Sequence, residues 1–155
     1  MGKRLGLPAV HLDTLYWLPG SLAPPPGAHR AAFAAAFVQE AWISEGNFIE
    51  TFDLRLPRAD LVVILDRPRW LCLWRVVRRA MFSRDERPDL APGCPEQFDR
   101  QLLRDIWCYE AETRPRLEAA LFAYGGNTPI VRLHSDRAVA AFLAELIRSP
   151  PSPAP

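Results

Sequence analysis

The feature that most constrains the fold is a continuous apolar run at residues 61–65, Leu-Val-Val-Ile-Leu, which ends at Asp66. A strand that is apolar at every position, rather than at alternate ones, is typical of a parallel sheet whose two faces are both covered. Parallel strands need long crossover connections, which are usually helical. The run therefore predicts an α/β domain built around a mostly parallel sheet.

Similar patterns predict most of the other elements. Short apolar runs indicate strands, and apolar side chains three or four positions apart indicate helices. We expect three further strands, at residues 8–12, 42–44 and 130–133. The expected helices include 29–41, with Phe33 and Phe37 facing inward; a helix after Pro68, with Trp70, Trp74, Val77 and Met81 as its core face; and 136–147.

Size and composition fit one domain. The chain has 155 residues, and we expect a domain at 1–147 followed by a disordered, proline-rich tail at 148–155. The formal net charge of +1 provides no overall attraction to nucleic acid or to an acidic membrane. Three cysteines without a CxxC pair favour a reducing, cytoplasmic setting, and no apolar stretch is long enough for a membrane helix.

Four tracts of the sequence carry a resemblance to a known family. They are GLPAVHLDTLYWLPG, WISEGNF, RADLVVILDRPRWLCLWRVVRR and RPDLAPGCPEQFD. Together they resemble the topology modulation proteins, a branch of the P-loop kinase-like proteins that is similar to adenylate kinase. The resemblance reaches to about Leu146. It implies a three-layer P-loop kinase-like fold that binds ATP and Mg²⁺, with a substrate region and an arginine-bearing lid.

One part of that family pattern does not occur in the sequence. The phosphate-binding loop G-x-x-x-x-G-K-[ST] does not fit ahead of Leu5. In the family, the strand before this loop lies in the middle of the sheet, between the strands expected here near Trp42 and Leu61. We therefore expect a gap at that position in the sheet, and no ATP site formed by residues 1–155 alone.

Polar residues at strand ends are the first candidates for a site, because open α/β sheets bind ligands beyond the carboxyl ends of their strands. By resemblance, Asp13 contacts the substrate or Mg²⁺, and Glu45 holds Mg²⁺ where the family tract W-x-x-D-G-N has an aspartate. Both acids are open to a structural interpretation, as loop or turn residues. Asn47 is a candidate substrate contact beside the turn at Gly46. Asp66 before Pro68 is interpreted as a helix cap.

Arginines are the second group of candidates, because guanidinium groups match phosphate oxygens. Arg55 and Arg78 are expected to face an anionic substrate. Arg75, Arg79 and Arg84 are expected to stabilise charge during phosphoryl transfer. A solvated helix face balanced by nearby acids is the alternative for this group.

Three interpretations of function remain open from the sequence. The complete protein transfers a phosphoryl group from ATP to a nucleotide or a small hydroxyl substrate. Alternatively, the chain is a non-catalytic module that binds nucleic acid or protein through its arginines. It is otherwise an inactive fragment of the kinase-like fold. The near-neutral charge favours the first interpretation over nucleic-acid binding.

Overall fold

The computed structural model describes residues 2–18, 22–25, 27–82 and 100–148. Four short strands alternate with helices, as expected for an α/β domain. The strands are β1 (Ala9–His11), β2 (Ile43–Glu45), β3 (Val62–Leu65) and β4 (Ile130–Leu133). The helical segments are α1 (Gly2–Leu5), α2 (Leu12–Tyr16), α3 (Ala28–Ala36), η1 (Ile49–Thr51), α4 (Phe52–Arg55), η2 (Leu56–Arg58), α5 (Arg69–Phe82), α6 (Arg100–Cys108), the π-helical η3 (Tyr109–Thr113), α7 (Arg114–Tyr124) and α8 (Asp136–Arg148).

The strands form two separate parallel pairs. β1 pairs with β2, with Ala9 opposite Ile43, and β3 pairs with β4, with Val62 opposite Ile130. Within the described residues, no ladder joins β2 to β3. The break falls between the strands that begin at Ile43 and Val62, where the resemblance implies a gap.

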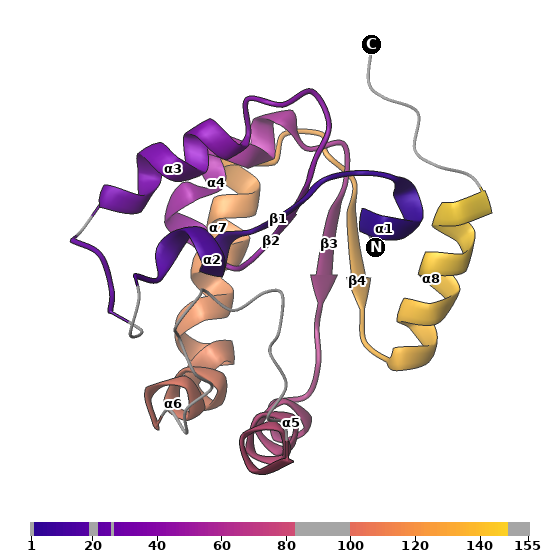
Figure 1. The fold of residues 1–155 in the computed structure, drawn as a ribbon. Helices are drawn as coiled ribbons and strands as arrows, with labels where there is room; N and C mark the ends of the chain where they lie inside the picture. The colour runs from indigo at the N-terminus through magenta and orange to yellow at the C-terminus, as the bar shows by residue number, and fades with distance from the viewer. Residues whose placement is uncertain (1, 19–21, 26, 83–99, 149–155) are drawn as a thin grey trace.

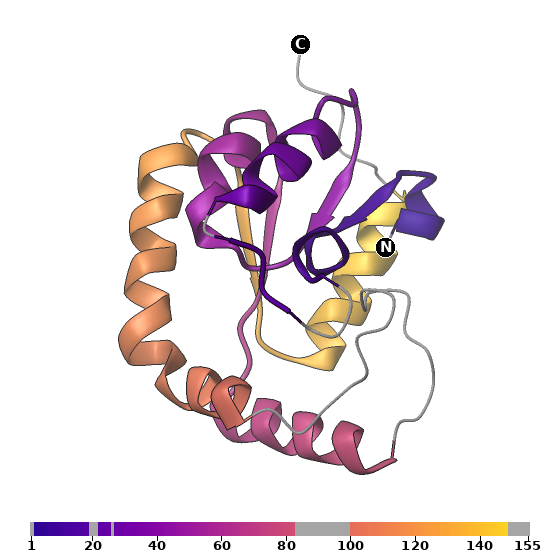
Figure 2. The ribbon, with the colours of Figure 1, turned by 60° about the vertical axis from the view of Figure 1, so that its left-hand side comes forward.

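Helices cover both faces of the strands (Figure 1). α3, α4 and α7 lie on one side, and α8 lies on the other side next to β4. Figure 2 shows the same three layers from a second direction, with α5 and α6 at one end of the molecule. No helix in the described ranges is long and apolar enough to cross a membrane.

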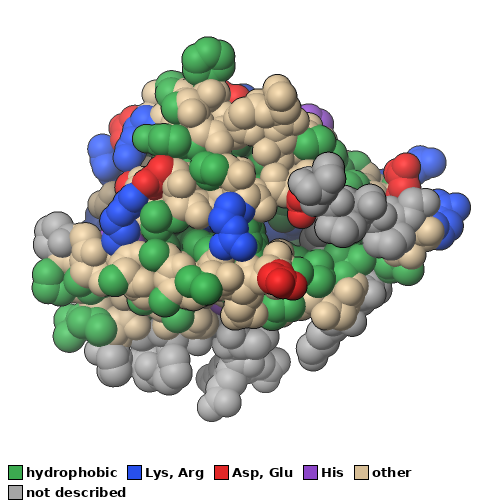
Figure 3. Space-filling view, turned by 90° about the horizontal axis from the view of Figure 1, so that it is seen from above, with side chains coloured by type: hydrophobic (Ala, Val, Ile, Leu, Met, Phe, Trp, Pro, Cys, Tyr) green, Lys and Arg blue, Asp and Glu red, His purple; other side chains and the backbone are tan. Residues whose placement is uncertain are grey.

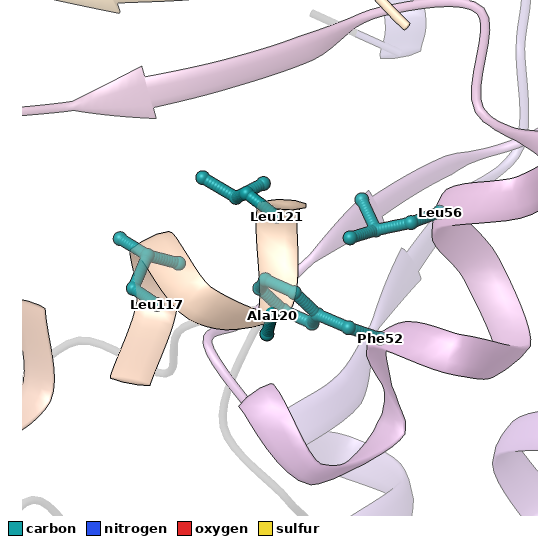
Figure 4. Packing of buried hydrophobic residues seen from close by; sticks show 5 residues of the cluster. All are labelled: Phe52, Leu56, Leu117, Ala120 and Leu121. Atoms are coloured by element: carbon teal, nitrogen blue, oxygen red, sulfur yellow. The ribbon is translucent and has the colours of Figure 1, made fainter. Parts of the chain in front are cut away.

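The hydrophobic core is divided like the sheet. One cluster joins α4 and η2 to α7 through Phe52, Leu56, Leu117, Ala120 and Leu121, which point toward one another in Figure 4. Val62 and Ile64 of β3 pack against this cluster. The other cluster is built by Leu12, Phe33 and Phe37, with Val10 of β1 against it. Each strand pair therefore has its own small core, and the inward orientation of Phe33 and Phe37 is confirmed.

Three sequence predictions need correction. The helix expected at 29–41 spans only Ala28–Ala36. β3 is not covered along its length, since its first three residues are half-buried and Leu65 is 65% exposed. The expected core face of α5 is wrong, because Trp70, Trp74 and Met81 are exposed by 67%, 55% and 64%. An apolar stripe is buried only where another element packs on it, and α5 lies at the end of the molecule, against α6.

The last described helix reaches one residue past the expected domain boundary at 147. α8 ends at Arg148, so this first residue of the expected tail is still helical. The rest of the expected tail, 149–155, lies outside the described residues.

Candidate functional site

A cavity of about 930 Å³ lies where the two strand pairs separate. β2 and the turn that follows it form one wall, and β3 forms another. Residues of η1, α4, α5, α6, η3 and α7 also line it. Residues that come just after three of the strands reach it, namely Asp13, Gly46 and Asp66. The cavity therefore opens at the carboxyl ends of the strands, where ligands bind in α/β sheets.

Arg55 is the most deeply buried charged residue described at this cavity. It is the last residue of α4, its exposed fraction is 7%, and its guanidinium lies 4.7 Å from the centre of the Phe52 ring. One terminal nitrogen donates to the Ser44 hydroxyl at 2.9 Å. The other donates to the carbonyl oxygens of Gly46 at 3.0 Å and Asn47 at 2.7 Å. Arg55 thus fixes the turn that follows β2.

The positive charge of Arg55 has no carboxylate within ion-pair distance among the described residues. Its buried Nε also has no hydrogen-bond partner in that part of the chain. Loss of hydration lowers the pKa of Arg55 to about 10, with Glu50 acting in the opposite direction. The side chain is still charged at neutral pH, so the cavity contains a cation that forms no ion pair with any carboxylate in the described ranges.

Asp13, Glu45 and Asn47 come together at the same cavity, as their positions after β1 and at the end of β2 predict. Glu45 stands opposite His11 in the β1–β2 register, and its Oε2 lies 2.7 Å from His11 Nδ1. All three candidate side chains are exposed. No group of three or more His, Cys, Asp or Glu residues in the described ranges is arranged to hold a metal ion.

Gly46 has a structural role in this turn, as the sequence suggests. Its φ of 131° is a backbone conformation that other residues rarely adopt. A Cβ at this position would lie 2.9 Å from the Cβ of Leu12. Glycine therefore allows the turn after β2 to approach the start of α2 closely.

The α5 arginines that the sequence singled out are not part of this cavity. Arg75, Arg78 and Arg79 line a separate hollow together with Phe82. Arg75 donates to Asp136 at the start of α8 over 2.7 Å, and Arg78 lies 5.0 Å from the centre of the Trp74 ring. The structure therefore does not bring these candidates to Asp13 and Arg55. Arg84 lies outside the described residues.

Asp66 has a different role from the helix cap that the sequence suggests. Its carboxylate pairs with Arg114 at the start of α7, and His134 Nδ1 lies 3.7 Å from it. The pair links the end of β3 to a helix distant in sequence.

Several residues of the cavity were not singled out from the sequence. Burial, with Asp66 nearby, raises the pKa of Tyr109. Arg67, Arg69 and Arg116 also reach the cavity. A signal was available for Arg67 and Arg69, since they follow a strand directly, but none was available for Arg116.

The fold and the cavity define a class: an open α/β domain of parallel strands with an arginine at a cavity beyond the strand ends. No protein family, curated protein or solved structure matches this chain.

Proposed function

We propose that this chain is the acceptor-binding part of a kinase-like phosphotransferase, and that it binds a nucleotide or another small phosphate-bearing molecule in the cavity. The observation that carries the proposal is Arg55, a buried cation at the carboxyl ends of the strands that has no ion-pair partner in the part of the chain that the structure describes. A buried charge is costly unless it is paired. A phosphate group supplies that pairing, because guanidinium groups bind phosphate oxygens through charge-assisted hydrogen bonds.

The carboxylates at the cavity have a secondary role in this proposal. Mg²⁺ is commonly held by one or two carboxylates together with substrate phosphates and water. Asp13 and Glu45 supply only two carboxylates, both are exposed, and Glu45 also contacts His11. They therefore fit that pattern only when a phosphate ligand supplies further oxygen atoms. With such a ligand they would hold Mg²⁺, which would neutralise phosphate charge. Either carboxylate is also suited to orient a substrate hydroxyl.

A second candidate function is a module that binds single-stranded nucleic acid. It is favoured by α5, where Trp70 and Trp74 are exposed and Arg78 lies over the Trp74 ring. Exposed aromatic rings beside arginines are surfaces on which bases stack. The balance of charge argues against it. Arg75 pairs with Asp136, which it shares with Arg67, and the formal net charge of the whole chain is only +1. The face drawn in Figure 3, at the end of the molecule opposite α5, has basic and acidic side chains interspersed.

Calorimetric titration of residues 1–155 tests the first proposal. We expect AMP to bind and adenosine, which lacks the phosphate, to bind far more weakly. Arg55→Lys keeps the positive charge but loses the planar guanidinium, which can donate two parallel hydrogen bonds to a phosphate. This variant should weaken AMP binding about tenfold or more, because a charge-assisted hydrogen bond is lost. Circular dichroism checks that the variant is folded.

Arg137→Gln is the matched control, because Arg137 is an exposed arginine of α8 that does not line the cavity. We expect it to leave AMP affinity unchanged. ATP with Mg²⁺ should bind no more tightly than AMP, since the 155 residues contain no G-x-x-x-x-G-K-[ST] loop. Equal binding of AMP and adenosine, or an unaltered affinity in a folded Arg55→Lys variant, would show that the proposal is wrong.

A further inference from the structure

Among the described residues, nothing pairs with the backbone edge of β3 on the side away from β4. The amide of Val62 donates to the Pro129 carbonyl at 2.9 Å, and the amide of Asp66 donates to the Leu133 carbonyl at 3.1 Å. Backbone groups alternate direction along a strand, so the amides and carbonyls of Val63 and Leu65 point to the other edge. That edge faces the cavity.

Within the same part of the chain, β2 has a matching edge that no described strand pairs with. The amide of Ile43 donates to the Pro8 carbonyl at 2.8 Å, on the β1 side. By the same alternation, the amide and carbonyl of Ser44 point away from β1, and Ser44 lines the cavity that Val63 lines. Two open strand edges therefore share one cavity.

The two edges run in the same direction. β3 points toward the lower part of Figure 1, and β2 points toward the lower part of Figure 2, which differs only by a turn about the vertical axis. Helices lie on both sides of this region. Open strand edges are templates for a further strand.

We propose that the space between β2 and β3 binds an extended segment of a partner polypeptide, which adds a parallel strand and joins the two pairs into one sheet. The helices on both faces require a segment that is apolar at nearly every position, like residues 61–65 themselves. This mode of recognition is strand addition, in which main-chain hydrogen bonds supply affinity and side-chain packing supplies specificity. The inference does not depend on the proposed function, because it rests on the backbone groups of Ser44, Val63 and Leu65 rather than on the Arg55 guanidinium.

A separate partner is favoured over a second copy of this chain. Its own described apolar strands at residues 62–65 and 130–133 are already paired with each other. A second copy would have to break its own β3–β4 ladder to donate either one. A partner with an unpaired apolar segment has no such cost.

The test is amide hydrogen exchange of residues 1–155, followed by NMR, with a synthetic peptide as probe. The peptide carries the sequence of residues 61–66 between pairs of lysines, and its control is the same peptide with N-methyl groups on alternate amides. The unmodified peptide should slow exchange at Ser44, Val63 and Leu65 by about tenfold or more, because these amides become hydrogen-bonded. The amides of Val62 and Ile64, which already bond to β4, serve as internal references.

The N-methylated peptide keeps the side chains, but its methyl groups block hydrogen bonding along one of its two edges, so it should not slow exchange at Ser44 of β2 and at Val63 and Leu65 of β3 together. Three results would overturn the inference. They are slow exchange at these amides without any peptide, equal effects of the two peptides, and no effect of the unmodified peptide.

Discussion

The guanidinium of Arg55 donates to the Asn47 carbonyl oxygen over 2.7 Å, and so joins the end of α4 to the turn that follows β2. The turn carries Gly46 and Asn47, and the cavity opens beside it. A single buried arginine therefore both shapes the candidate site and supplies its charge. Stability and ligand binding should both depend on it, and the two effects can be separated by variants.

Replacement of Arg55 by methionine should lower the free energy of unfolding by about 1–3 kcal/mol, because the Gly46 and Asn47 carbonyls lose their donor within a largely buried region. Urea denaturation measures this change. Arg137→Gln, on an exposed part of α8, should alter stability by no more than about 0.5 kcal/mol. An Arg55→Met protein as stable as the wild type would mean that these hydrogen bonds do not hold the turn.

Gly46→Ala should destabilise the protein more than Gly6→Ala does. Both glycines have positive φ, of 131° and 66°, so each alanine variant incurs backbone strain of about 1–2 kcal/mol. Only at position 46 does the new methyl group also meet Leu12, at 2.9 Å, while nothing lies within 4 Å at Gly6. Thermal unfolding of both variants under the same conditions separates the cost of backbone strain from the cost of the steric contact with Leu12. Equal losses would indicate that the turn shifts to accommodate the methyl group.

Phe33→Ala should cost about 3–5 kcal/mol, because Phe33 is fully buried and packs edge-on against Phe48, with ring centres 5.1 Å apart. Removal of the ring leaves a cavity in the small core beside β1. Phe122→Ala is the control, since Phe122 is 93% exposed and should change stability by no more than about 0.5 kcal/mol. Chemical denaturation of both variants provides the comparison, and similar losses would contradict the assigned core.

The Arg30–Asp53 ion pair predicts that the stability of the fold depends on pH. The hydrogen bond from Arg30 lowers the pKa of Asp53 in the folded protein, whereas the unfolded chain has the ordinary value. A lowered carboxyl pKa stabilises the fold above the unfolded-state pKa of about 4, and this contribution is lost as the pH falls through the folded-state pKa. Asp53→Asn should therefore lower stability at pH 7 and have little effect at pH 2, as measured by urea denaturation.

Asp60→Asn controls for the loss of an acid, because Asp60 is exposed and has no ion-pair partner in the ranges that the structure describes. It should leave stability at pH 7 unchanged. An Asp53→Asn variant whose loss of stability is the same at pH 7 and pH 2 would rule out the ion pair as the cause.

Local patterns in the sequence were sufficient for several elements. Residues 62–65 form a strand and Phe33 faces the core, because continuous apolar runs and helical spacing reflect local backbone geometry. The positions of Asp13 and Glu45 at one cavity also follow from local information, since carboxyl ends of parallel strands meet at one edge. The predicted break between β2 and β3 came from the resemblance rather than from the residues.

Only the tertiary structure decided which side chains are buried and which charged side chains form ion pairs. The spacing of Trp70 and Trp74 indicates a helical stripe but not whether another element packs on it, and both are exposed. Arg75 is paired with Asp136, 61 residues away in the chain, rather than with a site beside Arg55. Burial and ion pairing depend on elements that are distant in sequence. For that reason the sequence determined the elements of this domain, while their packing decided that Arg55 is the buried cation of the cavity.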